Sequence, residues 1–352
     1  MEQNITKTEV NNEEEEALPE EDAEEQEAEY YYSDDENNVF EYRFAEMIGK
    51  GSQSSVYSVI NRRTGEKAAA KVYRYAMLQR RTLDNDEPPL VSVANEIKLM
   101  AEIQHPYIIP LTEVIDDQVA GQLVILMPFA KYGDLQSYVD DHKPSEKALS
   151  VFFYQIADAV KFIHSRNIVH RDLKPENILV FSEERVMLSD FSVSTVLEPP
   201  DVMLSESKGP PAYLSPEELN GEDYYPKPAD VWAFGVALYK CLFGYFPFNI
   251  DKGKGQSEAS TFVIVTNLVN SEELVIPENK FDQNAIEIIK SALQKDPSKR
   301  PTFEEIVLNP WFDHVRELDK KIKEEFEEEK KKKSENENKN ENENQNDNEN
   351  EN

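Results

Sequence analysis

One stretch of eight residues in the middle of the chain combines side chains that could transfer a phosphoryl group. It reads HRDLKPEN over residues 170–177 and contains a carboxylate at Asp172, an ammonium group at Lys174 and a carboxamide at Asn177. A carboxylate can orient a hydroxyl group and accept its proton, a lysine can steady a phosphate, and an amide can hold a magnesium ion. So specific a combination is the strongest functional signal in the sequence.

Three other segments carry groups that fit the same chemistry. Asp190 follows an apolar strand-like run and could bind magnesium. Lys71 lies between apolar neighbours, where a lysine is usually an edge residue that extends its ammonium group to solvent. The segment IGKGSQSSV over residues 48–56 has two glycines, which let the backbone approach a phosphate closely, although such a segment alone is more often a plain hairpin turn.

The elements that must position these groups change type along the chain. Residues 42–73 alternate as strands do, a helical pattern covers residues 93–104, and apolar extended runs follow at 108–114 and 122–129. From about Asp134 onward helical periodicity dominates, for example over residues 149–165. The pattern predicts an α+β fold in which a small strand-rich lobe precedes a larger helical lobe.

Most of the acidity belongs to the two ends of the chain. The formal net charge of the 352 residues is −32, of which residues 1–40 carry −15 and residues 313–352 carry −6. We expect residues 1–40 to be a disordered acidic tail, 313–333 a charged helix and 334–352 a disordered Glu/Asn-rich tail. The acidic balance also argues against a nucleic-acid-binding protein, which needs clustered basic residues.

The sequence favours a soluble protein of a reducing compartment. The N-terminus has neither a basic start nor an apolar run, so no secretory signal is expected. Residues 231–248 are apolar but include Lys240, and a helix buried in a core explains them better than a membrane span. The single cysteine, Cys241, cannot form an internal disulfide. We expect a cytoplasmic location, with the nucleus left open, and no membrane partner.

Taken together, the motifs resemble those of eukaryotic protein kinases over about residues 42–312. The resemblance implies a bilobal protein-kinase fold in residues 41–312, with an N-lobe to about residue 130 and a C-lobe from about 131. It also implies a signalling enzyme, expected to be a monomer, that transfers the γ-phosphate of ATP to proteins with Mg²⁺ as cofactor. The lysine two residues after Asp172 resembles the serine/threonine branch.

The register of that family assigns a role to each site residue. The catalytic set is Asp172, Lys174, Lys71 and Glu96, in which Glu96 holds Lys71, and Asn177 and Asp190 bind magnesium. The nucleotide is expected to contact Ile48, Gly49, Gly51, Val56, Ala69, Lys71, Met127, Pro128, Ala130, Asp134 and Leu179. Met100, Leu111, His170 and Phe191 are expected to form a spine between the lobes. Glu217 should pair with Arg300, and Asp230 should either accept N–H groups of the catalytic loop or cap its own helix.

Three departures from the family pattern keep a non-enzymatic alternative open. Ser54 and Ser192 stand where the family has glycine, and Pro210 stands where serine/threonine kinases place a threonine that bridges the catalytic aspartate and lysine. A pseudokinase scaffold with weak or no activity is therefore the rival interpretation. A small-molecule kinase is disfavoured by the Pro216-Glu217 anchor and the intact activation segment.

Finer sequence features suggest which group of kinases the chain resembles and how its activity is regulated. Residues 111–117, residues 190–194 and a proline-containing insertion before the Glu96 helix resemble the calcium/calmodulin-dependent group, especially kinases whose substrates are other kinases. Residues 313–333 are too mixed in charge for a calmodulin target. Glu206 is expected either to pair with Arg171 in place of a phosphorylated residue or to be a solvated loop residue, with phosphorylation of a neighbouring serine as another switch. Glu176 and Asp134 predict a preference for basic residues near the phosphoacceptor.

Overall fold

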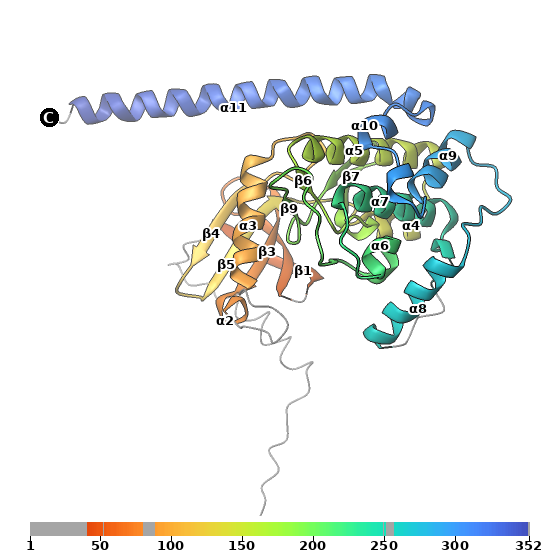
Figure 1. The fold of residues 1–352 in the computed structure, drawn as a ribbon. Coiled ribbons are helices and arrows are strands. Elements are labelled where there is room, and N and C mark those ends of the chain that lie inside the picture. Colours follow the sequence, from red (N-terminus) through yellow and green to blue (C-terminus); the bar gives the residue numbers. More distant parts are fainter. Residues whose placement is uncertain (1–40, 52, 80–88, 249, 251–256, 351–352) are drawn as a thin grey trace, which may run out of the picture.

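The computed structural model describes residues 41–51, 53–79, 89–248, 250 and 257–350. The predicted acidic tail over residues 1–40 and most of the predicted insertion before Glu96 lie outside the described residues. Figure 1 shows a sheet-containing part beside a larger helical part. This confirms the predicted α+β arrangement, with strands first and helices after them.

A five-stranded antiparallel sheet forms the first part. Its strands lie in the order β1-β2-β3-β5-β4. They are β1 (Tyr42–Lys50), β2 (Ser54–Asn61), β3 (Lys67–Arg74), β4 (Glu113–Asp117) and β5 (Gln122–Pro128). Helix α2 (Tyr75–Leu78) follows β3, and helix α3 (Pro89–Glu102) precedes β4. The predicted extended run at 108–114 becomes a strand only from Glu113, because Ile108 and Ile109 instead pair with Leu188 of the second part.

The second part is mainly helical. Its longer helices are α4 (Leu135–His142), α5 (Glu146–Ser165), α7 (Pro226–Phe243), α8 (Glu258–Ser271) and α9 (Gln283–Ala292), and its short ones are α6 (Pro216–Leu219) and α10 (Phe303–Ile306). Short strands pair as β6 (Ile168–Val169) with β9 (Thr195–Val196), and β7 (Ile178–Ser182) with β8 (Arg185–Leu188). The 3-10 turns are η1 (Pro175–Asn177), η2 (Pro211–Tyr213), η4 (Pro297–Lys299) and η5 (Pro310–Val315).

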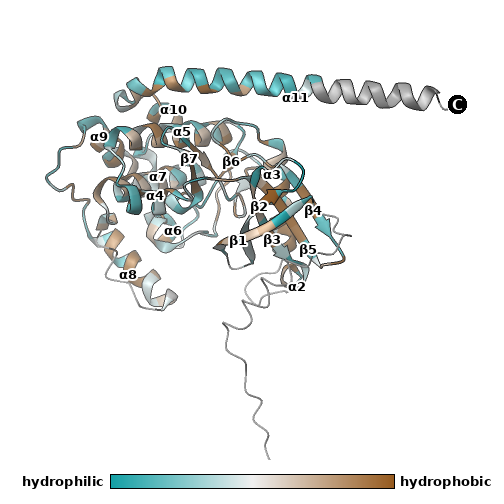
Figure 2. Cartoon of the chain, turned by 180° about the vertical axis from the view of Figure 1, so that it is seen from behind, coloured by the Kyte–Doolittle hydropathy of each residue, from teal (hydrophilic) through white to brown (hydrophobic). Residues whose placement is uncertain are grey.

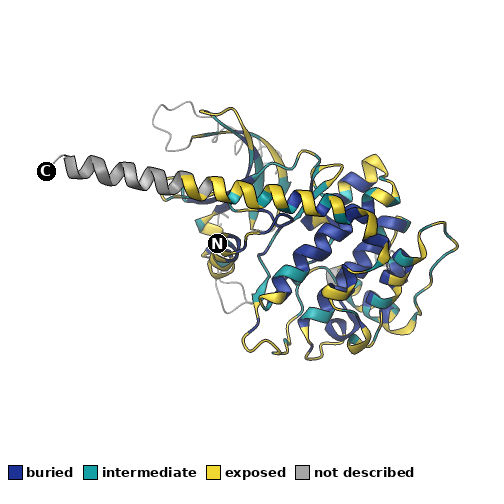
Figure 3. Ribbon diagram, turned by 90° about the horizontal axis from the view of Figure 1, so that it is seen from above, coloured by how far each residue is buried: buried dark blue, intermediate teal, exposed yellow. Residues whose placement is uncertain are grey.

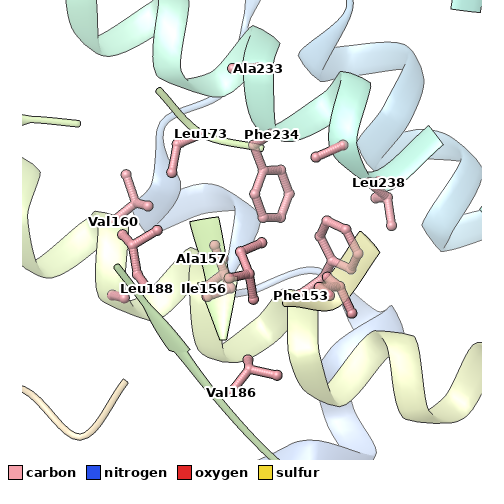
Figure 4. Close-up of a cluster of buried hydrophobic side chains, with 14 of the residues drawn as sticks. Phe153, Ile156, Ala157, Val160, Leu173, Val186, Leu188, Ala233, Phe234 and Leu238 are labelled. Carbon is pink, nitrogen blue, oxygen red and sulfur yellow. The ribbon is translucent and has the colours of Figure 1, made fainter. Parts of the chain in front are cut away.

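Helices α5 and α7 build the core that supports the loop over residues 170–177. Figure 4 shows Phe153 of α5 and Phe234 of α7 in one apolar cluster with Leu173 of that loop. The two phenyl rings meet edge to face with centroids 5.3 Å apart, an arrangement that aromatic pairs favour. A side chain at Gly235 would place its Cβ 2.7 Å from Ala292 Cβ, so the close approach of α7 to α9 requires glycine. The buried helix predicted over residues 231–248 is confirmed as α7, although it ends at Phe243, and most of its residues are buried.

The last helix, α11 (Arg316–Asn350), is longer than predicted. It begins after η5 and continues through residues 334–350, for which the sequence predicted disorder. No Pro or Gly occurs after Pro310, so no residue interrupts the helical hydrogen bonds. Figures 2 and 3 show the described part of its surface as mainly hydrophilic and exposed. No helix among the described residues is long and apolar enough to cross a bilayer.

The start of α11 is fixed to the rest of the protein by a buried carboxylate. Asp319 accepts hydrogen bonds from the hydroxyl groups of Tyr107, at 2.7 Å, and Tyr154, at 2.9 Å. The neighbouring Lys323 ammonium group lies 2.7 Å from the carboxylate of Asp158, which is buried in α5. The first turns of α11 are therefore part of the folded domain.

Candidate active site

A cavity of about 420 Å³ lies between the two parts of the fold. Its lining residues come from β1, β2, β3, α3, β5, the segment after β5, and β7, among others. Its lining includes all of the residues predicted to contact a nucleotide except Gly51, namely Ile48, Gly49, Val56, Ala69, Lys71, Met127, Pro128, Ala130, Asp134 and Leu179. Gly51 instead closes the hairpin turn, where its N–H donates to the Ser54 carbonyl at 2.7 Å.

The cavity also contains residues that the sequence reasoning missed. They are Ile109, Phe129, Lys131, Gly133 and Ser189, and Glu176, which the sequence placed near the phosphoacceptor, lines the cavity as well. Phe129, Lys131 and Gly133 alternate with predicted positions along the segment that joins the lobes, which is a signal that could have found them. Ile109 and Ser189 have no such signal, because they reach the cavity through pairing between distant segments.

A buried ion pair holds Lys71 at the back of the cavity. Lys71 Nζ lies 2.7 Å from Glu96 Oε1 of α3 and 3.2 Å from Asp190 Oδ1. Burial alone would lower the pKa of Lys71, but the carboxylates of Glu96 and Asp190 outweigh it and the pKa is raised. Tyr73 was not predicted for this site. It follows Lys71 by two residues on β3, which puts both on one face of the strand, and its hydroxyl donates to Glu96 Oε2 at 2.8 Å.

Asp172 has one carboxylate oxygen engaged and one without a partner. Oδ2 accepts from Lys174 Nζ at 2.6 Å and from Asn177 Nδ2 at 2.8 Å. Oδ1 is buried and has no hydrogen-bond partner among the described residues. Gly209, with φ of +90°, lies against it so closely that a Cβ there would be 2.8 Å from Oδ1. A buried carboxylate oxygen without a donor is costly, so a donor that reached this atom after a shift of the Gly209 segment would relieve the cost.

Asp230 of α7 fixes the backbone of this loop. Its carboxylate accepts from the His170 N–H at 2.9 Å, the Arg171 N–H at 2.8 Å and the His164 ring at 2.8 Å. Burial alone would raise the pKa of Asp230, but these donors lower it below its usual range. Arg171 has φ of +67°, a conformation that a non-glycine residue keeps only when its surroundings hold it. Asp230 does not cap α7, whose N-cap residue is Tyr225.

The donor set beside the cavity fits a magnesium ion bound mainly by phosphate oxygens. The Asn177 amide nitrogen is committed to Asp172, which leaves the amide oxygen for a cation. Burial would raise the pKa of Asp190, but Lys71 lowers it to about 2, so the carboxylate is ionised at neutral pH. No cluster of three or more His, Cys, Asp or Glu side chains that could hold a metal occurs among the described residues. Two oxygen ligands are what magnesium takes where phosphates complete its coordination.

Two members of the predicted spine, His170 and Phe191, are in direct contact, and the other two belong to the same core or pack against it. The His170 and Phe191 rings are 5.1 Å apart, and Met100 is also buried, whereas Leu111 is partly buried against the same core. The Ser192 carbonyl accepts from the Ser92 hydroxyl of α3 at 3.1 Å, which ties the segment after Asp190 to the helix that carries Glu96.

The sequence left two alternatives open for Glu206, in the segment after Asp190. The Arg171 guanidinium contacts the backbone carbonyl of Glu206. The Glu206 carboxylate is 75% exposed and lies 3.1 Å from Lys208 Nζ, a cation two residues away. The structure therefore has the exposed loop residue and not the pair between this carboxylate and Arg171. The predicted pair of Glu217 and Arg300 is confirmed as a buried bidentate contact at 2.6 and 2.8 Å.

Comparison with known proteins places this site in context. The family described as "Protein kinase domain" matches residues 42–312. NUAK family SNF1-like kinase 1 of Homo sapiens is 32% identical over 271 residues, which are 77% of this chain and 38% of that protein. CBL-interacting protein kinase 16 of Oryza sativa subsp. japonica is 32% identical over 273 residues, 77% of this chain and 56% of its own length. CBL-interacting serine/threonine-protein kinase 20 of Arabidopsis thaliana is 30% identical over 274 residues, which are 77% of this chain and 58% of that protein.

The chain thus spans between about two fifths and three fifths of the length of these three curated relatives. These relatives fall in the calcium/calmodulin-dependent-like group that the sequence resembles. None of the three names is that of a kinase acting on other kinases, so that finer assignment stays a prediction.

Proposed function

Because the chain belongs to the protein kinase family, we propose that it is an active enzyme that phosphorylates serine and threonine hydroxyl groups of proteins. The observation that carries the proposal is the half-satisfied carboxylate of Asp172. Its Oδ2 is held by Lys174 and Asn177, and its buried Oδ1 has no donor among the described residues. A hydroxyl group of an acceptor protein supplies the missing donor.

The side chains in and beside the cavity have different roles in the proposed reaction. Asp172 Oδ1 accepts the hydrogen bond of the acceptor hydroxyl, orients its oxygen and takes its proton. ATP would supply the phosphoryl group: the acceptor oxygen would bond to the γ-phosphorus while the bond from that phosphorus to the β–γ bridging oxygen breaks, and ADP would leave. Asn177 and Asp190 would hold Mg²⁺, which would offset negative charge on the phosphates. Lys71, kept in place by Glu96, binds the phosphates, while Ile48, Val56, Ala69 and Leu179 enclose the base.

Two backbone groups are available to orient the base. Pro128, the last residue of β5, keeps its carbonyl and lacks only an N–H, and Ala130 provides an N–H two residues later. An adenine amino group donates to the carbonyl and a ring nitrogen accepts from the N–H, so the proline removes no contact that the base needs.

The pseudokinase alternative rests mainly on Pro210, which cannot bridge Asp172 and Lys174 as a threonine hydroxyl does. In this protein the two side chains are in direct contact at 2.6 Å, so the bridge is not needed to hold them together. Ser192 does not displace Asp190, whose carboxylate remains beside Lys71. These contacts support activity over a scaffold role.

The experiment compares the wild type with Asp172→Asn in a magnesium-dependent transfer assay on a peptide library. We expect the variant to bind nucleotide with nearly unchanged affinity while turnover falls by roughly a hundredfold or more, because the proton acceptor is lost. Asp141→Asn, at an exposed position of α4, is the matched control. Equal turnover of the wild type and Asp172→Asn, or no turnover by a folded wild type that binds nucleotide, would reject the assignment in favour of the scaffold.

A further inference from the structure

The carboxylate of Glu176, which the sequence suggested for binding basic residues of a substrate, is already paired inside the protein. Glu176 Oε1 lies 3.3 Å from Lys240 Nζ, and Oε2 accepts from the Tyr213 hydroxyl at 3.3 Å. Lys240 Nζ also donates to the Tyr213 hydroxyl oxygen at 3.0 Å. The three side chains come from η1, η2 and α7 and form a closed triangle of polar contacts.

Packing holds the Lys240 ammonium group in that position. It lies 4.5 Å from the centroid of the Phe246 ring and 5.5 Å from that of Tyr213. The Lys240 side chain is only 15% exposed, compared with 41% for Glu176. A cation between two aromatic rings and a carboxylate is attracted by all three groups, so this lysine is not a free surface side chain.

The triangle lies where an acceptor protein must pass. Glu176 is four residues after Asp172 and lines the nucleotide cavity. Tyr213 follows the segment of Gly209, which lies against Asp172 Oδ1. A chain that delivers a hydroxyl group to this oxygen therefore presents a neighbouring side chain to Glu176 and Lys240.

The second carboxylate that the sequence suggested for binding basic residues, that of Asp134, also has hydrogen-bond donors within the protein. Asp134 caps helix α4, where Oδ1 accepts from the Ser137 N–H at 2.9 Å and Oδ2 from the Ser137 hydroxyl at 2.8 Å. The charge of Glu176 is thus countered by Lys240, whereas the two Asp134 oxygens accept from uncharged donors of Ser137 and are committed to the helix cap.

We propose that Lys240 is a specificity-determining residue that occupies the position a substrate cation would take beside Glu176. The inference rests on the proposed transfer to protein hydroxyl groups. A basic side chain at this position would be repelled by the ammonium group of Lys240 and would have no free carboxylate as a counter-charge. An uncharged side chain is not repelled and needs no counter-charge. The site therefore selects acceptor sequences with an uncharged residue here, which replaces the predicted preference for basic residues.

The test uses the full chain and a peptide library in which arginine or alanine is placed at each position on either side of the acceptor. Lys240→Met keeps the length and packing of the side chain but removes its charge, and Lys240→Met with Glu176→Gln removes both charges. Lys227→Ala is the control, because Lys227 lies on the same helix but bonds to Asn167, away from the triangle. Turnover and, separately, peptide binding by fluorescence anisotropy are measured for each protein.

We expect the wild type and Lys227→Ala to show no preference for arginine at any position near the acceptor. Lys240→Met should gain a preference of about tenfold for arginine at one position, in turnover and in binding, because an exposed carboxylate becomes available. The gain should vanish in the double variant. A wild type that already prefers arginine, a Lys240→Met variant without the gain, or a gain that persists without the Glu176 charge overturns the inference. If no protein shows turnover but the binding pattern holds, the proposed activity fails while the role of Lys240 stands.

Discussion

Asp230→Asn is the substitution that most directly tests how the fold positions the catalytic loop. The buried carboxylate accepts three hydrogen bonds, two at Oδ2 and one at Oδ1. An amide has one acceptor oxygen. If that oxygen replaces Oδ2, the amide nitrogen faces the N–H of Arg171, and two donors oppose each other.

The cost follows from these contacts. One buried N–H is left unsatisfied, at about 1–3 kcal/mol, and two bonds to a charged acceptor become bonds to a neutral one, at about 0.5–1 kcal/mol each. We expect the free energy of unfolding to fall by about 3 kcal/mol and Tm by about 6 °C or more. Turnover should fall at least tenfold at temperatures where the variant is folded, because Arg171 loses its anchor and Asp172 is the next residue.

The pH dependence gives a second readout. The folded-state pKa of Asp230 is below its ordinary value of 3.8, so the carboxylate stabilises the fold fully above that value and progressively less as the pH falls through the folded-state pKa. The difference in stability between wild type and variant should therefore shrink in acid. Urea unfolding at several pH values measures this difference in the free energy of unfolding, and Asp223→Asn, at an exposed position, is the control. A loss below about 1 kcal/mol with unchanged turnover would refute the anchoring role.

Two further substitutions test ion pairs and the last helix. Glu217→Gln should lower the free energy of unfolding by about 3 kcal/mol, because it leaves the buried Arg300 guanidinium without its counter-charge. The control Glu41→Gln, in an exposed ion pair, should change the free energy of unfolding by less than about 0.5 kcal/mol. Equal losses for the two variants in urea unfolding would contradict this prediction. Asp319→Ala removes the acceptor of two buried tyrosine hydroxyls and should cost about 2–4 kcal/mol or detach the start of α11. Hydrogen exchange separates these outcomes, and unchanged protection of α11 with unchanged stability would show that the helix is not anchored there.

The sequence predicted elements well where a periodic pattern coincided with burial. Helix α5 was expected over residues 149–165 and begins at Glu146 because Ser145 caps it, with its hydroxyl accepting from the Ala148 N–H. The helix expected at 93–104 begins at Pro89, where proline fits a first turn, although apolar periodicity starts later. The clearest difference is at residues 334–350, where the sequence analysis expected disorder and α11 continues to Asn350. Low apolar content predicts that a segment gains little from burial, but it does not interrupt helical hydrogen bonds.

Within the site, motif spacing predicted which residues line the cavity but not how side chains pair. Spacing fixes the backbone register, and the register carries Lys71, Asn177 and Asp190 to the cavity, with Asp172 hydrogen-bonded to Asn177 beside it. Pairing depends on competition among nearby charges. Glu206 binds Lys208 because that cation is two residues away, and Glu176 binds Lys240 because α7 brings together residues 64 positions apart in the chain.

The carboxylates near the cavity differ in how their oxygen atoms are satisfied, and this difference separates their roles. Asp230 and Glu96 have both oxygens engaged by protein donors, which suits groups that position a loop or a lysine. Glu176 is likewise engaged at both oxygens. Asp172 alone among these four has a buried oxygen without a partner in the described chain. The protein leaves that oxygen without a donor, which supports the proposed role of Asp172 as the proton acceptor. Glu176, in contrast, is a group neutralised by Lys240, a distinction that residue types alone could not make.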